Sequence, residues 1–372
     1  MRILNVSSCA PLRRPGEVVD AMRIFASAMG QIDNVGDTVL RRAFLDVLRP
    51  AGDLHVFIGA RGDDYLSGLG LAESDRLFRS SGTWRKTISR AAFREAIGYA
   101  FNAGEMETQR AYAMHYARLA PLLMASRARG GRAIHAGLGI RTATPWRYPI
   151  AATLRLCDIV SWRDSYSRSM MGLGTVAPDW AFALGSADGA LTTEWSAQGR
   201  TRLAVSLRYN GALPDSTWVR TVRAFAKSRD LEVVTVSQIM RDGPLAQELA
   251  RDLGGEAVVW DGPDHATQEE RLRSVYRTSR LVLTNRLHAA VIALTEGAIP
   301  LALASSSYDK TPRTLATAGI VGVTVDSRMA EAAGLEDTAA AALASTVPIL
   351  QKVVEARGAL RRLGQEIHRL TA

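Results

Sequence analysis

The chain has 372 residues, of which 47% are hydrophobic and 22% are charged, and its formal net charge is +9. This composition is typical of a globular protein, and the length is enough for two domains. The positive charge comes mainly from scattered arginines without a basic tail, a recognition helix or a zinc finger, so nucleic acid is not an expected partner. No run of 18 apolar residues occurs, so no membrane-spanning helix is expected.

The first residues predict a strand at 3–6, too short for the apolar region of a signal peptide. The two cysteines, Cys9 and Cys157, are far apart in the sequence and belong to no Cys-x-x-Cys pair. Both features favour a cytoplasmic protein with free thiols.

A loop rich in turn residues precedes a predicted helix at 38–48, whose apolar positions share one face and leave Arg41 outside. Asn34 and Asp37 are residues that cap helices, and Gly36 lets the backbone approach a ligand closely. A plain loop with a capped helix explains the same residues. A strand follows at 54–59.

Residues 61–87 are rich in glycine, serine and charge, and we expect a long loop or a linker into a helix at 88–100. A tryptophan and four cations in this part of the chain suggest contact with an anionic membrane surface or a lipid-linked acceptor, although a solvated basic face explains them as well. These residues are Trp84, Arg85, Lys86, Arg90 and Arg94.

Further along, the sequence predicts a long helix at 105–129 and a strand at 133–140 that ends in a glycine turn. A short strand at 156–160 is followed by Arg163 and Asp164, which could either meet a ligand or form an internal salt bridge between two loops.

Beyond a linker at 185–199, short apolar strands alternate with helices. Strands are expected at 203–208, 232–237, 257–260, 281–283 and 301–304, and helices at 218–226, 244–253, 268–278 and 289–294. This alternation predicts a parallel sheet with right-handed crossovers. From residue 348 onward, apolar residues recur at helical spacing and predict an amphipathic helix that packs on the body.

The most informative stretch runs from the strand at 281–283 through Thr284, Asn285, Arg286 and His288 into a helix. Polar residues at the carboxyl end of a strand, where a helix begins, occupy the usual site position of an open α/β sheet. The helix N-terminus and an arginine suit a carboxylate or a phosphate, and histidine can exchange a proton near neutral pH. A capping arginine and a buried histidine are the plain alternative.

Arg208 ends another strand of the same predicted sheet. Since the carboxyl ends of parallel strands meet at one edge, Arg208, Arg286 and His288 should lie together. They would form an anion site with a proton donor.

The sequence resembles the polysaccharide pyruvyl transferase family in several segments from Asn34 to Lys310. They are Asn34-Val35-Gly36-Asp37, Arg163-Asp164 with a later Ser167, Pro178-Asp179, Ser206-Leu207-Arg208, Thr284-Asn285-Arg286-Leu287-His288, Gly297-Ala298-Ile299-Pro300 and Ser307-Tyr308-Asp309-Lys310. Asp33 stands where the family has the first glycine of a Gly-Asn-x-Gly-Asp motif, which weakens that segment.

The resemblance implies an α/β protein of two Rossmann-like domains that face a cleft, similar to the glycosyltransferase B arrangement. The expected domains are residues 1–184 on the acceptor side, 200–345 on the donor side, and a C-terminal helix at 346–372 that packs back on the body. It also implies an enzyme that moves the pyruvyl group of phosphoenolpyruvate onto two hydroxyls of a sugar. A cyclic ketal forms and phosphate leaves.

On this reading, donor binding falls to Arg208, Asn285, Arg286 and Lys310, and catalysis to Arg286 with His288 as the proton donor, which could contribute about 10²–10⁴-fold. Acceptor binding falls to Asn34, Asp37, Arg163 and Asp164. Phosphoenolpyruvate is a co-substrate, and no cofactor or metal is expected because the six histidines are dispersed without a metal-binding motif.

Two other functions fit the same architecture. One is a glycosyltransferase that uses a sugar nucleotide, whose diphosphate the arginines would hold. The other is a carbohydrate-binding protein without activity. The expected acceptor is a sugar, either lipid-linked or part of a glycolipid.

Overall fold

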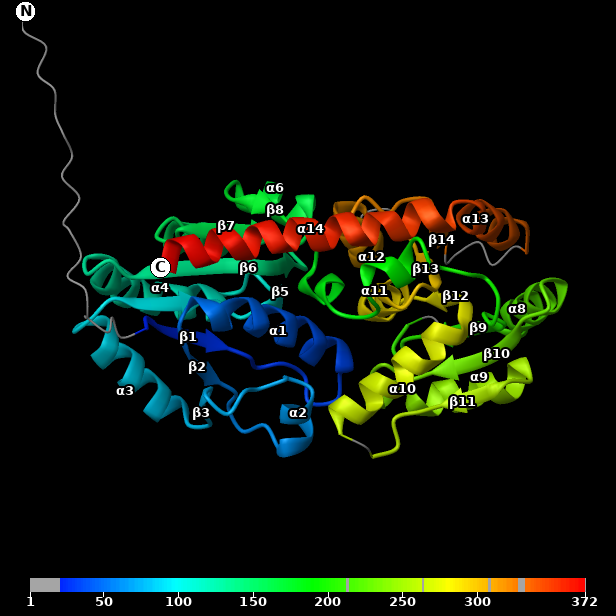
Figure 1. The fold of residues 1–372 in the computed structure, drawn as a ribbon, viewed down its shortest axis with the longest axis horizontal. Coiled ribbons are helices and arrows are strands. Elements are labelled where there is room, and N and C mark those ends of the chain that lie inside the picture. Colours follow the sequence, from blue (N-terminus) through cyan, green and yellow to red (C-terminus); the bar gives the residue numbers. More distant parts are fainter. Residues whose placement is uncertain (1–20, 212–213, 263, 307–308, 327–331, 372) are drawn as a thin grey trace, which may run out of the picture.

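The computed structural model describes residues 21–211, 214–262, 264–306, 309–326 and 332–371 (Figure 1). Within them, two parallel β-sheets occupy the two ends of an elongated molecule, and helices cover their faces. The strand expected at residues 3–6, like Ser307 and Tyr308, lies outside the described residues.

The first sheet is formed by the N-terminal half of the chain, and all its strand pairings are parallel. Its strands are β1 (Arg23–Ser27), β2 (Asp53–Phe57), β3 (Arg76–Phe78), β4 (Ile97–Ala100), β5 (Gly104–Met106), β6 (Arg132–Ile140), β7 (Ile159–Trp162) and β8 (Thr175–Val176). The spatial order is β3-β2-β1-β4-β6-β7-β8, and β5 pairs with β6. The helices are α1 (Val35–Leu48), η1 (Arg49–Ala51), α2 (Asp63–Ser67), α3 (Ser81–Ala92), α4 (Arg110–Arg127), α5 (Arg147–Leu154), α6 (Ser165–Met171), η2 (Trp180–Ala183) and α7 (Asp188–Leu191).

Side chains of β1 show how this sheet is covered on both faces. Ile24 and Ala26 belong to a core with residues of α1, whereas Phe25, which points to the other face, belongs to a second core with residues of α3, α4 and α5. Successive side chains of a strand point to opposite faces, so a strand that is buried on both faces is apolar throughout.

The second sheet is formed by residues 202–326 and is again parallel. Its order is β11-β10-β9-β12-β13-β14, with β9 (Arg202–Ser206), β10 (Glu232–Val236), β11 (Glu256–Val258), β12 (Ser279–Thr284), β13 (Ile299–Ala304) and β14 (Thr324–Asp326). The helices are α8 (Ser216–Ser228), η3 (Met240–Asp242), α9 (Gly243–Leu253), α10 (His265–Thr278), α11 (Leu287–Thr295), α12 (Lys310–Thr317) and α13 (Ala332–Ala344). The predicted alternation of strands and helices, and with it the α/β class, is confirmed.

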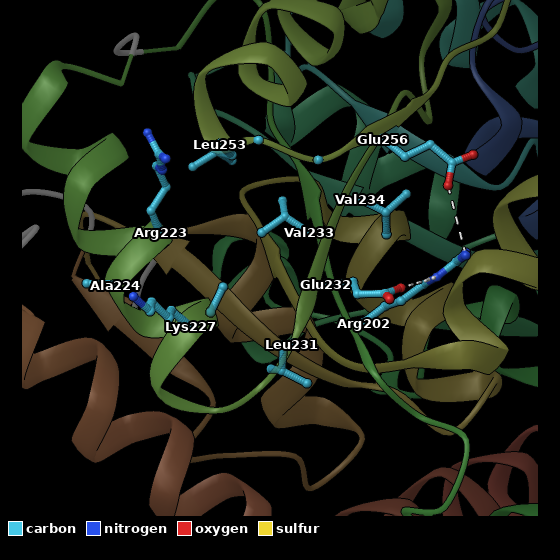
Figure 2. Close-up of a pocket in the computed structure, with 13 residues that line it drawn as sticks. Arg202, Arg223, Ala224, Lys227, Leu231, Glu232, Val233, Val234, Leu253 and Glu256 are labelled. Carbon is cyan, nitrogen blue, oxygen red and sulfur yellow. Dashed lines mark ion pairs between the residues drawn. The ribbon is translucent and has the colours of Figure 1, made fainter.

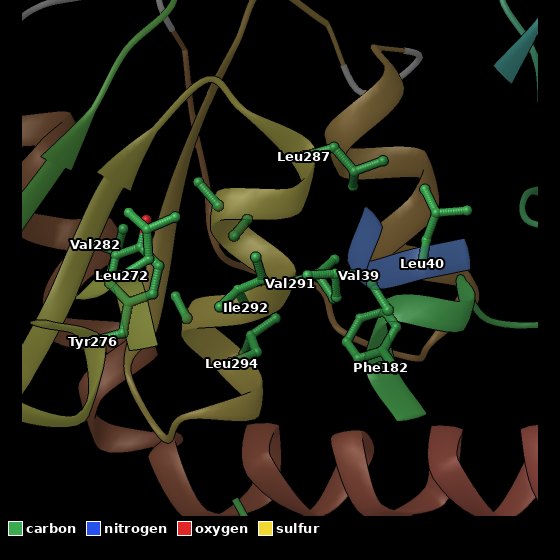
Figure 3. Packing of buried hydrophobic residues seen from close by; sticks show 14 of the residues in the cluster. Val39, Leu40, Phe182, Leu272, Tyr276, Val282, Leu287, Val291, Ile292 and Leu294 are labelled. Carbon is green, nitrogen blue, oxygen red and sulfur yellow. The ribbon is translucent and has the colours of Figure 1, made fainter. Parts of the chain in front are cut away.

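Helix α11 joins the two halves through apolar contacts. All nine of its residues are buried. Figure 3 shows Val291 and Leu294 of α11 facing Val39 of α1 and Phe182 of η2, while Ile292 lies toward the second sheet. Burial of each such side chain contributes about 1.5–3 kcal/mol. A helix that is apolar all round is therefore explained by its place between two layers.

The C-terminal helix α14 (Thr346–Thr371) runs along both halves, and its 26 residues span about 39 Å. Near its start it packs on α11 and α13, and near its end on α1 and β6. Arg357 donates hydrogen bonds to the carbonyl oxygens of Phe182 and Leu184, and Arg132 Nε donates to Leu370 O at 3.0 Å. The helix thus connects the segment between the two sheets, which contains Phe182 and Leu184, with elements of both halves.

Three element predictions in the first half are wrong. Residues 61–87 are not a long loop, since α2, β3 and most of α3 lie there. The helix expected at 88–100 ends at Ala92, and Ile97–Ala100 is the strand β4. The helix expected at 105–129 begins only at Arg110, because Gly104–Met106 pairs with β6 as β5. In the last two cases, pairing with a distant strand set the conformation of a short segment, and local propensity did not.

Two side-chain predictions are wrong as well. Trp84 is 8% exposed and packs on Phe25, Phe57 and Phe78, so it faces the sheet and cannot reach a membrane. Arg41 is 6% exposed and faces inward, where its Nε donates to Asn102 Oδ1 at 3.0 Å.

Candidate active site

A cleft of about 940 Å³ lies between the two halves, at the carboxyl ends of β9, β12 and β13. Among the residues that line it are Asn34, Glu105 and Arg141 from the first half and Leu207, Arg208, Trp218, Gln238, Asn285, Arg286, His288, Lys310 and Arg313 from the second. Six of the predicted site residues are therefore brought together: Asn34, Arg208, Asn285, Arg286, His288 and Lys310.

Arg208 and Arg286 are neighbours because their strands are in register. Thr284 of β12 pairs with Ser206 of β9, and each arginine follows its strand by two residues. The Asn285 side chain locks the two strand ends together, since its Oδ1 accepts a hydrogen bond from the backbone N–H of Arg208 at 2.9 Å. Asn285 thus has a structural role that the sequence did not suggest.

The two guanidinium groups differ in how they are neutralised. Arg286 makes a bidentate ion pair with Asp242, with Nε at 2.8 Å from Oδ2 and Nη2 at 2.5 Å from Oδ1. The Arg208 guanidinium makes no ion pair with the described part of the chain. Burial lowers the pKa of Arg208, and the positive charges of Arg286 and Arg141 lower it further. The cleft therefore holds an excess of positive charge that an anion would offset.

Asp242 was missed by sequence reasoning. It is fully buried, and besides Arg286 it accepts a hydrogen bond from the backbone N–H of Tyr209 at 3.0 Å. Its local sequence, an acid before Gly-Pro at the start of α9, reads only as the beginning of a helix. Its role depends on β10 being adjacent to β9, which no local signal shows.

His288 lies in the first turn of α11, where α1 of the other half approaches it closely. A Cβ atom on Gly36 would come within 2.3 Å of His288 Nδ1, so only glycine allows this approach. On the other side of the ring, His288 Nε2 is buried and lies 3.7 Å from Oδ2 of Asp179, in the segment before η2. The ring is therefore positioned by groups from the other half of the chain.

Asp179 is itself 1% exposed and lies 3.4 Å from Nη1 of Arg163. Burial alone would raise the pKa of Asp179, but the interaction with His288 and its charge, together with the charge of Arg163, hold this pKa well below its ordinary value. The Asp179 carboxylate therefore lies between the imidazole of His288 and the guanidinium of Arg163.

Arg163 and Asp164 are not at the surface of the cleft, which corrects the prediction that they bind the acceptor. Both are fully buried. Arg163 pairs with Asp179, and Asp164 caps α6 by accepting hydrogen bonds from the backbone N–H and the hydroxyl of Ser167 at 2.7 and 2.8 Å. The internal salt bridge was the right alternative for Arg163, although its partner is Asp179 and not Asp164.

Lys310 Nζ reaches across the cleft to Glu105 Oε2 of β5 at 2.8 Å, and Glu105 also binds Arg141. Burial alone would raise the pKa of Glu105, but Lys310, Arg163 and Arg141 hold it well below its ordinary value. Burial and the charge of Arg163 lower the pKa of Lys310 despite this pairing. Glu105, which sequence reasoning missed, thus forms ion pairs with two cations that line the cleft, Lys310 and Arg141.

Asn34 and Asp37 sit at the start of α1. Asn34 Oδ1 accepts from the backbone N–H of Gly36 at 3.0 Å and from Gln238 Nε2 of the other half at 2.7 Å. Asp37 does not line the cleft, and it accepts a hydrogen bond from the backbone N–H of Gln31 at 2.7 Å. Burial would raise the pKa of Asp37, but Arg41 and this hydrogen bond lower it. Asn34 is the predicted cap of α1 and also joins the halves, whereas Asp37 lies inside the helix and does not cap it.

The sequence was compared with families and structures of known proteins. A family model described as polysaccharide pyruvyl transferase matches residues 34–307. The chain belongs to the polysaccharide pyruvyl transferase family. The matched span contains Asn34, Arg208, Arg286 and His288, and it ends shortly before Lys310. No curated protein matches the chain.

Solved structures that resemble this pyruvyl transferase family member include HepE from Anabaena in complex with UDP, at 11% identity and a TM-score of 0.55 over 94% of this chain and 97% of that one. A glycosyltransferase from Rickettsia africae is 11% identical, with a TM-score of 0.54 over 94% of this chain and 99% of that one. UDP-GlcNAc 2-epimerase from Neisseria meningitidis, bound to UDP-GlcNAc, is 11% identical, with a TM-score of 0.52 over 89% of this chain and 94% of that one. At such identities the likeness concerns the fold alone, and it confirms the glycosyltransferase B-like arrangement of two Rossmann-like domains.

A second hollow of this family member, about 560 Å³ in volume, lies at the opposite edge of the second sheet, where β9, β10 and β11 begin (Figure 2). Arg202 lies 3.9 Å from both Glu232 and Glu256 there. Ligands of open α/β sheets bind at the carboxyl ends of strands, so we assign no function to this amino-end hollow.

Among the described residues, no group of three or more His, Cys, Asp or Glu side chains is arranged to hold a metal ion. No helix in the same part of the chain is long and apolar enough to cross a bilayer.

Proposed function

We propose that the chain transfers the pyruvyl group of phosphoenolpyruvate to two hydroxyls of one sugar in a glycan or glycolipid. Membership of the pyruvyl transferase family supports a transferase of this kind. The observation that carries the proposal is the pairing of strand ends that sets Arg208, whose guanidinium makes no ion pair within the described residues, beside Arg286 and His288 in one cleft.

The donor carries a carboxylate and a phosphate and therefore needs several cations. Arg208 offers a free planar fork that can bind either group through two hydrogen bonds. Arg286 keeps Nη1 for the donor while Asp242 fixes its other two nitrogens. Lys310 binds the phosphate after its ion pair with Glu105 breaks. Asn285 holds the strand end that carries Arg208 through its hydrogen bond with the Arg208 backbone.

His288 is the proposed general acid. Nε2 faces Asp179, so Nδ1 is the nitrogen proposed to protonate the donor. The Nδ1 proton goes to the methylene carbon C3, and the C2=C3 π electrons form the new C–H bond. The oxygen of the first sugar hydroxyl bonds to C2 and its proton returns to the imidazole.

The C2–O bond to phosphate then breaks, and the oxygen of the second hydroxyl bonds to C2 to close the ketal. Its proton leaves with inorganic phosphate. The cations of the cleft offset the charge on the departing phosphate, and a preorganised cation of this kind is worth about 3 kcal/mol.

The acceptor sugar is proposed to lie against the first half of the chain, residues 1–184, with the donor on residues 200–345 and the helix at 346–372 bracing both. Asn34, which caps α1, lines the cleft, although its Oδ1 already accepts a hydrogen bond from Gln238. Arg141 is a further candidate for the acceptor side because it lines the cleft and is exposed.

The first test is thermal stabilisation of the purified protein by phosphoenolpyruvate and, separately, by a panel of nucleotide sugars. A ligand that binds only the folded state at 100 times its Kd stabilises that state by about 2.7 kcal/mol. We expect stabilisation by phosphoenolpyruvate, loss of this effect in Arg208→Ala, and its retention in His288→Ala and in Arg223→Ala, a control on the exposed surface of α8.

Stabilisation by a uridine or guanosine diphosphate sugar, with no effect of phosphoenolpyruvate, would instead identify a glycosyltransferase on this fold. Sugar binding without turnover of any donor would identify a carbohydrate-binding protein.

A further inference from the structure

The sequence between Glu107 and Asp158 contains no acidic residue over 50 positions, 108–157, but it contains eight arginines. They are Arg110, Arg118, Arg127, Arg129, Arg132, Arg141, Arg147 and Arg155. A chain with 37 acidic residues among 372 would place about five in such a stretch by chance, so the local imbalance is pronounced. This region forms α4, β6 and α5.

Large apolar side chains are exposed on the same helices and on the loop between β6 and α5. Met124 is 59% exposed, Tyr148 63%, Met114 42% and Trp146 41%. Tyr112, in the first turn of α4, is 40% exposed. Single exposed apolar residues are ordinary, but five of them within an acid-free, arginine-rich segment form a surface with a distinct character.

Packing places these residues on one side of the molecule. Helices α3, α4 and α5 pack side by side on the face of the first sheet opposite α1 and α14. Tyr116 and Leu123 of α4 and Ile150 of α5 are buried in the core, whereas Met114 and Met124 of α4 and Tyr148 of α5 are exposed. We call the outward side of α4 and α5, with the loop between β6 and α5, the basic aromatic face.

The start of α4 and the loop before α5 are joined, which brings this face to the cleft. Thr108 Oγ1 donates to Thr142 O at 2.8 Å and accepts from the backbone N–H of Thr144 at 2.6 Å. Arg141 begins the same loop and lines the cleft. The basic aromatic face therefore extends from the rim of the cleft across the outside of the first half.

We propose that the basic aromatic face docks the protein on an anionic lipid bilayer. Arginines would bind headgroup phosphates, and the Trp, Tyr and Met side chains would enter the interface between headgroups and acyl chains. Exposed Arg85, Lys86 and Arg90 on the adjacent α3 add to the positive field. Docking here would present the rim of the cleft to molecules held in the membrane.

Lipid explains this face better than nucleic acid does. A surface that binds nucleic acid uses cations that track the phosphate backbone, with rings stacked on bases. Here the exposed apolar groups include two methionines on the outside of α4, which suit an acyl boundary and offer no platform for a base.

The test is co-sedimentation of the full chain with vesicles of phosphatidylcholine alone and of phosphatidylcholine with phosphatidylglycerol. We expect binding only to the anionic vesicles, with affinity that falls as salt is raised. Arg110→Glu with Arg118→Glu reverses two exposed arginines of α4 that make no ion pair within the described residues, and it should weaken binding about 30-fold.

The matched control is Arg223→Glu with Lys227→Glu on α8, which changes two exposed helical cations of the other half by the same charge and should leave binding intact. Trp146→Ser with Tyr148→Ser should also weaken binding, and quenching by brominated lipid should be lost in Trp146→Phe. The proposal does not rest on the proposed function, since sedimentation needs no turnover.

Equal loss of vesicle binding in the α8 control, or no binding by the unaltered chain, would overturn the proposal. So would binding to heparin or duplex DNA without binding to vesicles, which would assign the face to a soluble polyanion.

Discussion

Asp179 Oδ2 lies 3.7 Å from His288 Nε2, although one residue belongs to the segment before η2 and the other to the first turn of α11. The two halves of the chain therefore assemble the proposed acid together. Arg163 on the far side of Asp179 completes a buried row of three charged or titratable groups.

Asp179→Asn should reduce turnover more than it reduces donor binding. The amide keeps the shape of the side chain but removes the carboxylate charge that faces His288 Nε2, so the pH profile of turnover should change. We expect a loss of at least about tenfold, within the 10²–10⁴-fold attributed to general acid catalysis. Phosphate release with a glycan acceptor measures turnover, and thermal stabilisation by phosphoenolpyruvate measures binding.

Asp188→Asn, a control at a carboxylate that pairs with Arg357 outside the cleft, should leave the profile where it was. An unchanged pH profile in Asp179→Asn would show that Asp179 does not position His288.

Arg208→Ala and Arg286→Ala should differ in their effect on stability. Truncating Arg208 removes no ion pair known within the described residues, so the unliganded protein should keep its Tm. Truncating Arg286 leaves the fully buried carboxylate of Asp242 without its partner, which costs about 3 kcal/mol. Chemical denaturation of both variants measures this difference.

Arg286→Ala combined with Asp242→Asn should recover part of the lost stability, because the buried charge is removed together with its partner. Equal stability of the two single variants would show that Asp242 finds another partner.

Gly36→Ala should impair the site, because its Cβ would lie 2.3 Å from His288 Nδ1 and 2.5 Å from His288 Cγ. Either α1 or the imidazole must shift, and both the Tm and turnover should fall. Gly82→Ala is the matched control. Gly82 is likewise the second residue of its helix, and the nearest atom to an added Cβ is Ser80 Oγ at 3.7 Å. That variant should be as stable as the parent or more stable, since alanine favours helix. Similar behaviour of the two variants would mean that the contact with His288 is easily relieved.

Glu105→Gln should increase the affinity for phosphoenolpyruvate and for inorganic phosphate. The substitution releases Lys310 and Arg141 from a carboxylate that competes with the anion for both cations. We expect an increase of about two- to fivefold, since pairs at partly exposed sites contribute up to about 1 kcal/mol. Isothermal titration at low salt measures it, and weaker binding would show that Glu105 helps to position the cations for the donor.

His135 should make stability depend on pH. The side chain is fully buried between Phe101 and Trp162, and burial lowers the pKa of His135 to about 3. The unfolded chain takes up this proton near pH 6.5, so the folded state should lose stability as the pH falls from about 6.5 toward 3. Urea denaturation of His135→Leu between pH 7 and pH 4 should show a shallower decline than the parent. The same slope in both proteins would assign the decline to other groups.

The sequence by itself determined the α/β class and the proximity of Arg208, Arg286 and His288. A buried strand followed by a polar tip and a helix is a local pattern, and it located Arg208, Arg286 and His288 correctly, because parallel strands of one sheet bring their carboxyl ends to one edge. It also predicted the cap at Asn34 through residue type alone.

Only the tertiary structure decided which groups hold these residues. Asp242 is 44 residues from Arg286, and Glu105 is 205 residues from Lys310. Asp179 reaches His288 from the other half of the chain. The burial of Trp84 and of Arg163 was set by neighbours that are equally remote. A side chain's partner at such separations depends on strand order and on how the halves pack, and neither is encoded in the few residues around it.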